Sequence, residues 1–283
     1  MTKKIHGYGQ GDVETVISVE DVDRQAGALK NKSLTLKDLD ALTNNKPHLC
    51  IDSLKAGYGQ MEILHDIDLR VGDGQSLCMI GPNGAGKSTV LHSIFGFTKI
   101  FSGDISIDGQ KISHLTPNEK LKDSGIAYIL QDNSVFPDMT VEENLMMGGY
   151  LLEKTSDAKV AVEEVLSEYN RLGQRRNNKA SSLSGGERRL LEIARSLIMN
   201  PKILLVDEPS IGLEPRFINM VFEILGDLQN NQGKTILMVE QNAKKGLEFC
   251  DIGYVIVSGE LVLADEGSKL LESPEVGRLF LGG

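Results

Sequence analysis

A glycine-rich loop constrains the fold of this chain more than any other feature of its sequence. Residues 81–89 read GPNGAGKST and fit the pattern G-x-x-x-x-G-K-[ST]. The apolar residues 76–80 precede the loop, and the helix-like residues 90–97 follow it. The sequence therefore predicts a strand, a phosphate-binding loop and a helix in direct succession.

The residue types in this loop suit a nucleoside triphosphate. Glycines let successive backbone N–H groups point at phosphate oxygens, and the following helix adds the positive end of its dipole. We expect Lys87 to reach the β- and γ-phosphates and the Ser88 hydroxyl to bind Mg²⁺. A glycine-rich turn that only caps a helix is the alternative, and the preceding strand disfavours it. The residues expected to bind the nucleotide here are Gly81, Pro82, Asn83, Gly84, Ala85, Gly86, Lys87, Ser88 and Thr89.

Size and charge limit the class of protein. The 283 residues fit one large domain or two small ones, and an apolar content of 40% allows a sizeable core. A net charge of −10 argues against nucleic acid as a partner, because binding to its backbone requires a basic surface. No apolar run approaches the ~20 residues of a membrane-spanning helix, so another polypeptide would have to do any spanning.

Two parts of the chain differ in pattern. Residues 1–46 are polar and lack sustained periodicity, so we expect a loosely ordered extension with room for a short helix at 34–42. From residue 48 the pattern becomes strand-like. Alternating runs at 49–54 and 63–71 flank a turn at 57–59, and a hairpin signal covers 103–112.

The second half of the chain mixes helices with buried strands. Helical patterns dominate from 141 to about 200, as in residues 158–169 and 187–198. Continuous apolar runs at 203–206, 235–239 and 253–257 then alternate with helical segments. Helices between fully apolar strands are typical of a parallel sheet.

A pair of acids ends the apolar run at 203–206. We expect Asp207 to hold Mg²⁺ through water and Glu208 to polarise the water that attacks the γ-phosphate. Two acids placed where a strand meets solvent are the simpler explanation. The phosphate loop earlier in the chain makes the catalytic explanation the stronger one.

A third motif narrows the family. Residues 182–187 read SLSGGE and precede a helical run, so they suit either an anion site or an ordinary helix N-terminus. The order of motifs decides between the two. A phosphate loop, Gln131, SLSGGE and then LLVDEP at 204–209 resembles the ATP-binding cassette (ABC) ATPases over about residues 48–283.

This resemblance implies a fold and a set of site residues. The fold is α/β: a P-loop NTPase core with a mostly parallel sheet, an N-terminal antiparallel β subdomain and an inserted helical subdomain at about 132–200. Tyr58 matches the aromatic residue that stacks on adenine, although an exposed turn tyrosine is the alternative. Gln131 matches the glutamine that contacts Mg²⁺ and senses the transmembrane partner, so the implied metal residues are Ser88, Gln131 and Asp207.

The resemblance also implies a head-to-tail dimer. ATP then lies between the phosphate loop of one subunit and Ser184, Gly185 and Gly186 of the other. Each site is completed only when the two subunits close on each other.

Two departures from the family pattern concern catalysis. Gln241 stands where the family usually has a histidine. Glutamine donates a hydrogen bond to the γ-phosphate but cannot titrate, which favours Glu208 as the group that polarises water. Glu214 replaces an aspartate that normally crosses the dimer interface, and it is longer by one methylene group.

These departures resemble one subgroup, the second ATP-binding subunit of branched-chain amino acid importers, with its close relatives for urea and other amides. The residues that carry this resemblance are 239–242 (VEQN), 209–215 (PSIGLEP) and 280–283 (FLGG). It implies ATP hydrolysis at the cytoplasmic face of the inner (plasma) membrane, driving uptake through two transmembrane permease subunits. A second ATP-binding subunit and an extracytoplasmic solute-binding protein complete such systems.

Two other functions stay open. One is an ATPase for lipopolysaccharide export, a group that generally keeps the histidine absent here. The other is a cassette protein that acts on ribosomes or DNA, which the acidic balance and the single cassette disfavour.

Overall fold

A four-stranded antiparallel sheet forms the N-terminal β subdomain. The computed structural model describes residues 35–131 and 134–281. Within them this sheet has the strand order β2-β1-β4-β5. Its strands are β1 Pro47–Tyr58, β2 Met61–Gly72, β4 Lys99–Ile107 and β5 Gln110–Lys111. β1 pairs antiparallel with β2, as the two alternating runs predict, and β4 pairs antiparallel with β5, as the hairpin signal predicts. β1 also pairs antiparallel with β4.

A six-stranded sheet carries the phosphate loop, with the order β10-β9-β3-β8-β7-β6. Every neighbouring pair is parallel except β9 with β10, which confirms the predicted α/β class and mostly parallel sheet. All residues of β3, β7, β8 and β9 are buried, because helices or the other sheet cover both faces. The strands are β3 Ser76–Ile80, β6 Ile126–Ile129, β7 Ile203–Asp207, β8 Thr235–Val239, β9 Ile252–Val257 and β10 Glu260–Glu266.

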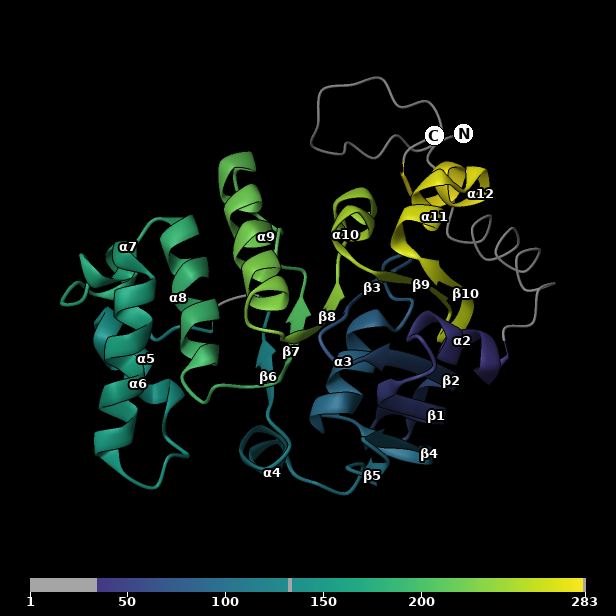
Figure 1. The fold of residues 1–283 in the computed structure, drawn as a ribbon, viewed down its shortest axis with the longest axis horizontal. Coiled ribbons are helices and arrows are strands. Elements are labelled where there is room, and N and C mark those ends of the chain that lie inside the picture. Colours follow the sequence, from purple (N-terminus) through teal and green to yellow (C-terminus); the bar gives the residue numbers. More distant parts are fainter. Residues whose placement is uncertain (1–34, 132–133, 282–283) are drawn as a thin grey trace.

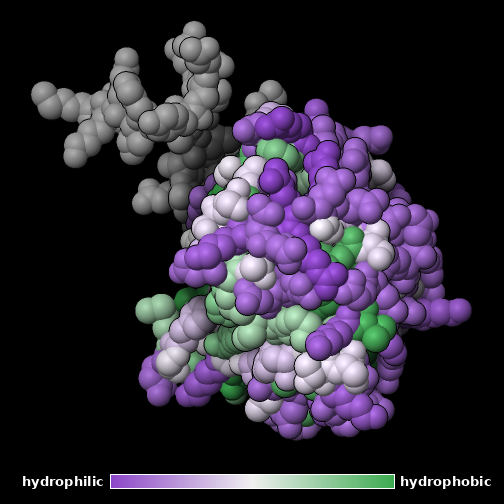
Figure 2. Space-filling view, turned by 90° about the vertical axis from the view of Figure 1, so that its left-hand side faces the viewer, coloured by the Kyte–Doolittle hydropathy of each residue, from purple (hydrophilic) through white to green (hydrophobic). Residues whose placement is uncertain are grey.

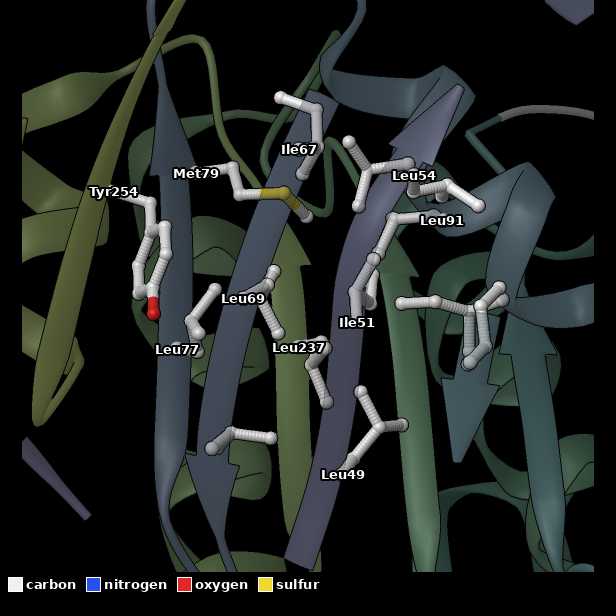
Figure 3. Close-up of a cluster of buried hydrophobic side chains, with 14 of the residues drawn as sticks. Leu49, Ile51, Leu54, Ile67, Leu69, Leu77, Met79, Leu91, Leu237 and Tyr254 are labelled. Atoms are coloured by element: carbon white, nitrogen blue, oxygen red, sulfur yellow. The ribbon is translucent and has the colours of Figure 1, made fainter. Parts of the chain in front are cut away.

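The main core lies between the two sheets and around helix α3 (Lys87–Phe95). Figure 3 shows its side chains pointing toward one another from strands of both sheets. The figure labels Leu49, Ile51, Leu54, Ile67, Leu69, Leu77, Met79, Leu91, Leu237 and Tyr254, all at most 1% exposed. This packing fixes α3, and hence the loop before it, between the sheets.

Helices cover the other face of the six-stranded sheet (Figure 1). They are α9 Pro215–Asn230, α10 Ala243–Phe249, α11 Gly267–Glu272, α12 Pro274–Val276 and a π-turn at Gly277–Leu281, and α4 Pro117–Lys122 lies before β6. Their apolar residues form a second core with Cys78, Leu204, Ile236 and Val255 of the strands. In the described ranges, no helix has the length and apolar character needed to span a bilayer.

A third core belongs to the helices between β6 and β7. These are α5 Val141–Gly148, α6 Thr155–Glu168, α7 Asn170–Gly173, the 3₁₀ turn Ala180–Ser182 and α8 Gly185–Leu197. They lie together at one end of the molecule (Figure 1). Their buried residues pack mainly on one another, from Val135 to Ile198. The face that they present is mostly hydrophilic, with smaller hydrophobic patches in its middle and lower half (Figure 2).

The segment expected to be a polar extension contains an ordered helix. Residues 1–34 lie outside the described residues, but α2 (Leu36–Leu42) begins with a capping box between Thr35 and Asp38. Its Leu39 is 1% exposed and belongs to the main core. Asp40 also accepts a hydrogen bond of 3.2 Å from Arg70 Nε of β2.

Two elements differ from the sequence-based expectations. β1 runs on to Tyr58, so the chain reverses at residues 59–60 and not over 57–59. β10 was not predicted: it follows the expected strand as the second arm of an antiparallel hairpin.

Candidate active site

The phosphate loop joins β3 to α3 in a conformation that requires glycine at its start. Gly81 has φ +146°, and a Cβ atom there would lie 2.0 Å from the carbonyl oxygen of Ile256. Lys87 folds back over the loop, and its Nζ donates hydrogen bonds of 2.9 Å to the carbonyl oxygens of Gly81 and Pro82. These bonds hold the loop and the first turn of α3 together.

Two opposing effects act on the pKa of the Lys87 ammonium group: burial and nearby carboxylates. Lys87 is 5% exposed. Desolvation lowers the pKa of Lys87, while the carboxylates of Glu208 and Asp207 act in the opposite direction. A cation close to two carboxylates and a loop of N–H donors suits a phosphate anion that carries a metal ion.

Asp207 ends β7 and meets the phosphate loop directly. Ser88 Oγ donates a hydrogen bond of 3.0 Å to Asp207 Oδ1, and the Tyr128 hydroxyl donates one of 3.0 Å to Oδ2. The parallel pairing of β6 with β7 and of β7 with β8 brings the carboxyl ends of these three strands together. Sequence reasoning did not single out Tyr128, although it lies in the apolar run that ends at Gln131.

Glu208 leaves the strand in an unusual conformation. Its φ is +44°, in the left-handed region that non-glycine residues seldom adopt. Its N–H donates to the carbonyl oxygen of Val239 on β8 at 2.9 Å. Gln131 Nε2 donates to Glu208 Oε2 at 3.0 Å, so the two predicted residues touch. The strained backbone is held by these neighbours, as is common at functional sites.

One cavity collects most of the predicted site residues. Its volume is about 440 Å³, and it opens over the phosphate loop. Besides Glu208 and residues of the loop, it is lined by Tyr58, Gln131 and Gln241, which come from three distant parts of the chain. The full lining is Tyr58, Ile63, Asn83, Gly84, Gly86, Lys87, Ser88, Thr89, Gln131, Glu208, Ile211 and Gln241.

Tyr58 stands at the edge of this cavity and is 44% exposed. Its hydroxyl lies 2.5 Å from Nδ1 of His92, and the two rings meet edge-on. Burial lowers the pKa of His92, while Asp207 acts in the opposite direction. His92 is a site neighbour that the sequence did not reveal, because nothing in the helical pattern of α3 distinguishes it.

Ser184, Gly185 and Gly186 do not line the cavity. They form the N-terminus of α8, where Ser184 and Glu187 make a capping box. Ser184 and Gly185 are exposed, whereas Gly186 is buried against Phe217 of α9. Within the described chain, the SLSGGE motif and the phosphate loop are therefore separate sites.

A second cavity of about 350 Å³ lies where the helices α5 and α8 meet β6. Its lining is largely apolar and includes Phe136, Met147 and Tyr150, which are 44%, 42% and 58% exposed. Arg195 lines the same cavity and stacks over Phe136 at 5.7 Å from the ring centroid. This groove shares no lining residue with the cavity over the phosphate loop.

The chemistry of the first cavity fits a nucleotide phosphate chain and Mg²⁺. The loop offers N–H donors and an ammonium, and Ser88 and Gln131 of the lining offer the hard oxygen atoms that Mg²⁺ prefers. Asp207 does not line the cavity, but its carboxylate is bonded to Ser88. The described residues contain no cluster of three or more His, Cys, Asp or Glu side chains suited to a metal.

Comparisons with known proteins identify the family. Residues 64–211 match the ABC transporter family. The chain is 40% identical over 235 residues to the high-affinity branched-chain amino acid transport ATP-binding protein BraG of Pseudomonas aeruginosa, covering 83% of this chain and 100% of that protein. It is 34% identical to the lipopolysaccharide export system ATP-binding protein LptB of Haemophilus influenzae, covering 83% and 97%.

Solved structures agree with this. A nucleotide-free ATP-binding cassette from an ABC transporter superposes with a TM-score of 0.74 at 28% identity, covering 84% of this chain and 100% of that one. The ADP conformation of an ATP-binding cassette superposes with a TM-score of 0.73 at 28% identity, covering 84% and 99%. The chain belongs to the ABC transporter family, and it is an ATP-binding subunit of the ATPase type.

Proposed function

We propose that this chain powers an importer, which takes up branched-chain amino acids or a related small solute through separate membrane subunits. ATP hydrolysis is supported chiefly by one observation: residues of the phosphate loop line the same cavity as Gln131, Glu208 and Gln241. The importer class is supported by 40% identity to BraG over its whole length, against 34% to LptB. Gln241 also supports it, because the lipopolysaccharide-export group generally keeps a histidine there.

We assign substrate binding to the phosphate loop and to Tyr58. Lys87 would bind the β- and γ-phosphates in place of its present bonds to the loop carbonyls. Tyr58 would stack on adenine at the cavity edge. Ser88, Asp207 and Gln131 would hold Mg²⁺, which when bound neutralises charge on the phosphate oxygens.

We assign the hydrolytic step to Glu208 and Gln241. Glu208 would orient the attacking water and accept its proton, since its carboxylate lies at the cavity between Gln131 and the loop. Gln241 would donate a hydrogen bond to the γ-phosphate. Its amide does not titrate, so proton transfer falls to the carboxylate.

The position of the SLSGGE motif outside the cavity supports a site shared between two subunits. Ser184, Gly185 and Gly186 lie outside the cavity at the N-terminus of α8. A second ATP-binding subunit, either a copy of this chain or a relative, would supply the same motif to complete the site. Closure of the two subunits would then couple hydrolysis to motion.

The apolar groove beside α5 and α8 supports a membrane partner. Exposed apolar side chains lining a groove mark an interaction site, and three of them line this one. We assign it to a transmembrane permease subunit at the cytoplasmic face of the membrane, with a solute-binding protein acting on the other side. In this scheme residues 48–283 form the ATP-binding domain, and residues 132–200 form its helical subdomain.

Two substitutions test the catalytic assignment. Lys87→Ala should abolish ATP binding, measured with a fluorescent ATP analogue. Glu208→Gln should keep ATP binding but lower phosphate release by about 10²- to 10⁴-fold, the usual effect of losing a general base. Phosphate release by Glu208→Gln at the wild-type rate would remove Glu208 from this role.

Uptake assays separate the importer from the exporter. Deletion of the gene should abolish uptake of radiolabelled leucine and leave surface lipopolysaccharide unchanged. Normal leucine uptake with loss of surface lipopolysaccharide would support the export function instead.

A further inference from the structure

Glu240 is a buried acid at the edge of the active site that none of the roles above uses. It follows β8 directly, between Val239 and Gln241, and is 1% exposed. Ser210 Oγ donates a hydrogen bond to Glu240 Oε1. Ser210 lies two residues after Glu208, so this bond joins the segments that carry Glu208 and Gln241.

The second oxygen of this carboxyl group is unusual. Glu240 Oε2 is buried and has no hydrogen-bond partner among the described residues. Two other titratable groups face the carboxyl group: Glu208 after β7 and Cys78 on β3, which itself lies beside Cys250. Burial raises the pKa of Glu240 to about 7, although the hydrogen bonds from the Ser210 hydroxyl and from the backbone N–H groups of Ser210 and Asn242 favour the ionised form.

Val239, the last residue of β8, and Glu240, the residue after it, thus both hold the chain after β7. The carbonyl oxygen of Val239 accepts from the N–H of Glu208 at 2.9 Å, and the Glu240 carboxyl group accepts from Ser210. Glu208 has the strained φ of +44° at this point. A strained residue keeps its conformation only where neighbours fix it on both sides.

We propose that Glu240 is a positioning residue for ATP hydrolysis, which through Ser210 holds Glu208 at the angle needed to reach the attacking water. The proposal rests on the catalytic role proposed above for Glu208. Glu240 acts in its neutral form, because the buried Oε2 then carries a proton and no unpaired charge. Ionisation places a second negative charge beside Glu208 in a buried site, which disfavours the packed arrangement.

Steady-state ATP hydrolysis by the purified protein tests this, with kcat and KM measured from about pH 5.5 to about pH 9. Glu240→Leu and Ser210→Ala should each lower kcat by about fivefold or more, the effect of one lost hydrogen bond, with little change in KM. The double variant should be no slower than the slower single variant, since both remove the same contact.

The pH profile distinguishes positioning from simple structural support. Wild-type kcat should fall as the pH rises through about 7, where Glu240 ionises. Glu240→Gln keeps an acceptor for Ser210 and cannot ionise, so it should recover most of the activity that Glu240→Leu loses and should lack this fall. Leu228→Ala, on the buried face of α9, is the matched control for destabilisation and should keep the wild-type profile.

The outcomes separate this proposal from the proposed function. A wild-type protein that hydrolyses no ATP would refute the function itself. If the wild-type enzyme is active, two results would refute only the role of Glu240. One is a kcat of Glu240→Leu equal to that of the wild type, and the other is identical pH profiles for the wild type and Glu240→Gln. If Glu240→Leu does not fold by circular dichroism, the Glu240→Gln profile alone decides.

Discussion

Glu208 and Glu240 show how two glutamates in similar positions acquire different properties. Each is the first residue after a parallel strand, β7 or β8, at the same edge of the sheet. Glu208 lines the cavity and contacts Gln131, whereas Glu240 is 1% exposed and faces Ser210. The environment of each carboxyl group, and not its place in the strand order, decides whether it meets substrate.

Burial of Glu240 should make the stability of the folded protein depend on pH. The pKa of Glu240 is about 7 when folded and 4.5 as the ordinary value, so the folded state binds more protons between these limits. Wild-type stability should therefore fall between about pH 4.5 and 7 relative to Glu240→Gln, and the difference should stay constant above pH 7. Its full size should be on the order of 3 kcal/mol.

Chemical denaturation of both proteins at several pH values measures this difference. Subtracting the two curves cancels the titrating groups that do not interact with Glu240. A constant difference from pH 5 to pH 8 would mean that Glu240 is already ionised in the folded protein.

Between elements, the contact of α8 with α9 links the SLSGGE motif to the chain after Glu208. Gly186 lies in the first turn of α8, and Phe217 lies in the first turn of α9. A Cβ atom on Gly186 would approach Phe217 Cδ1 to 2.0 Å. The motif glycine therefore permits close packing of two helices, in addition to any role at a ligand.

Gly186→Ala should destabilise the protein by about 1–3 kcal/mol, because the added methyl group overpacks the contact with Phe217. Thermal unfolding measures the loss. Phe217→Ala opens space, so the double variant should be more stable than the sum of the two single effects predicts. Strict additivity would show that the two residues do not compete for the same space.

Across the whole molecule, a buried arginine joins the helical part to the chain at the ends of β6 and β7. Arg189 of α8 is 5% exposed and crosses from the helical part to the sheet. Its Nη1 donates to the carbonyl oxygen of Leu130 at 2.7 Å and to Glu192 Oε2 at 2.8 Å. Leu130 precedes Gln131, so this contact connects the helices that line the groove to a residue of the nucleotide cavity.

The groove should be needed for assembly with the membrane subunits. Met147→Glu places a charge among apolar side chains of the groove, and it should sharply lower the amount of this subunit that co-purifies with them. Val160→Glu is the matched control, since Val160 is 59% exposed on α6 and lies outside the groove. Equal recovery of both variants would place the membrane partner elsewhere.

Several features of this protein follow from its sequence alone. The GPNGAGKST loop, the acids after β7 and the SLSGGE motif predict the family, because each depends on residue types at fixed local spacing. The alternation of apolar strands with helices likewise predicts the mostly parallel sheet. Local signals of this kind need no knowledge of distant contacts.

Other features depend on the tertiary structure. Tyr128 on Asp207, His92 on Tyr58 and Ser210 on Glu240 are contacts between residues far apart in sequence. β10 is an exception, because it forms a local hairpin with β9 and the Ser258-Gly259 turn signal before it could have revealed it. Burial set the properties of Glu240, since only the packing of β8 against its neighbours removes that carboxyl group from water.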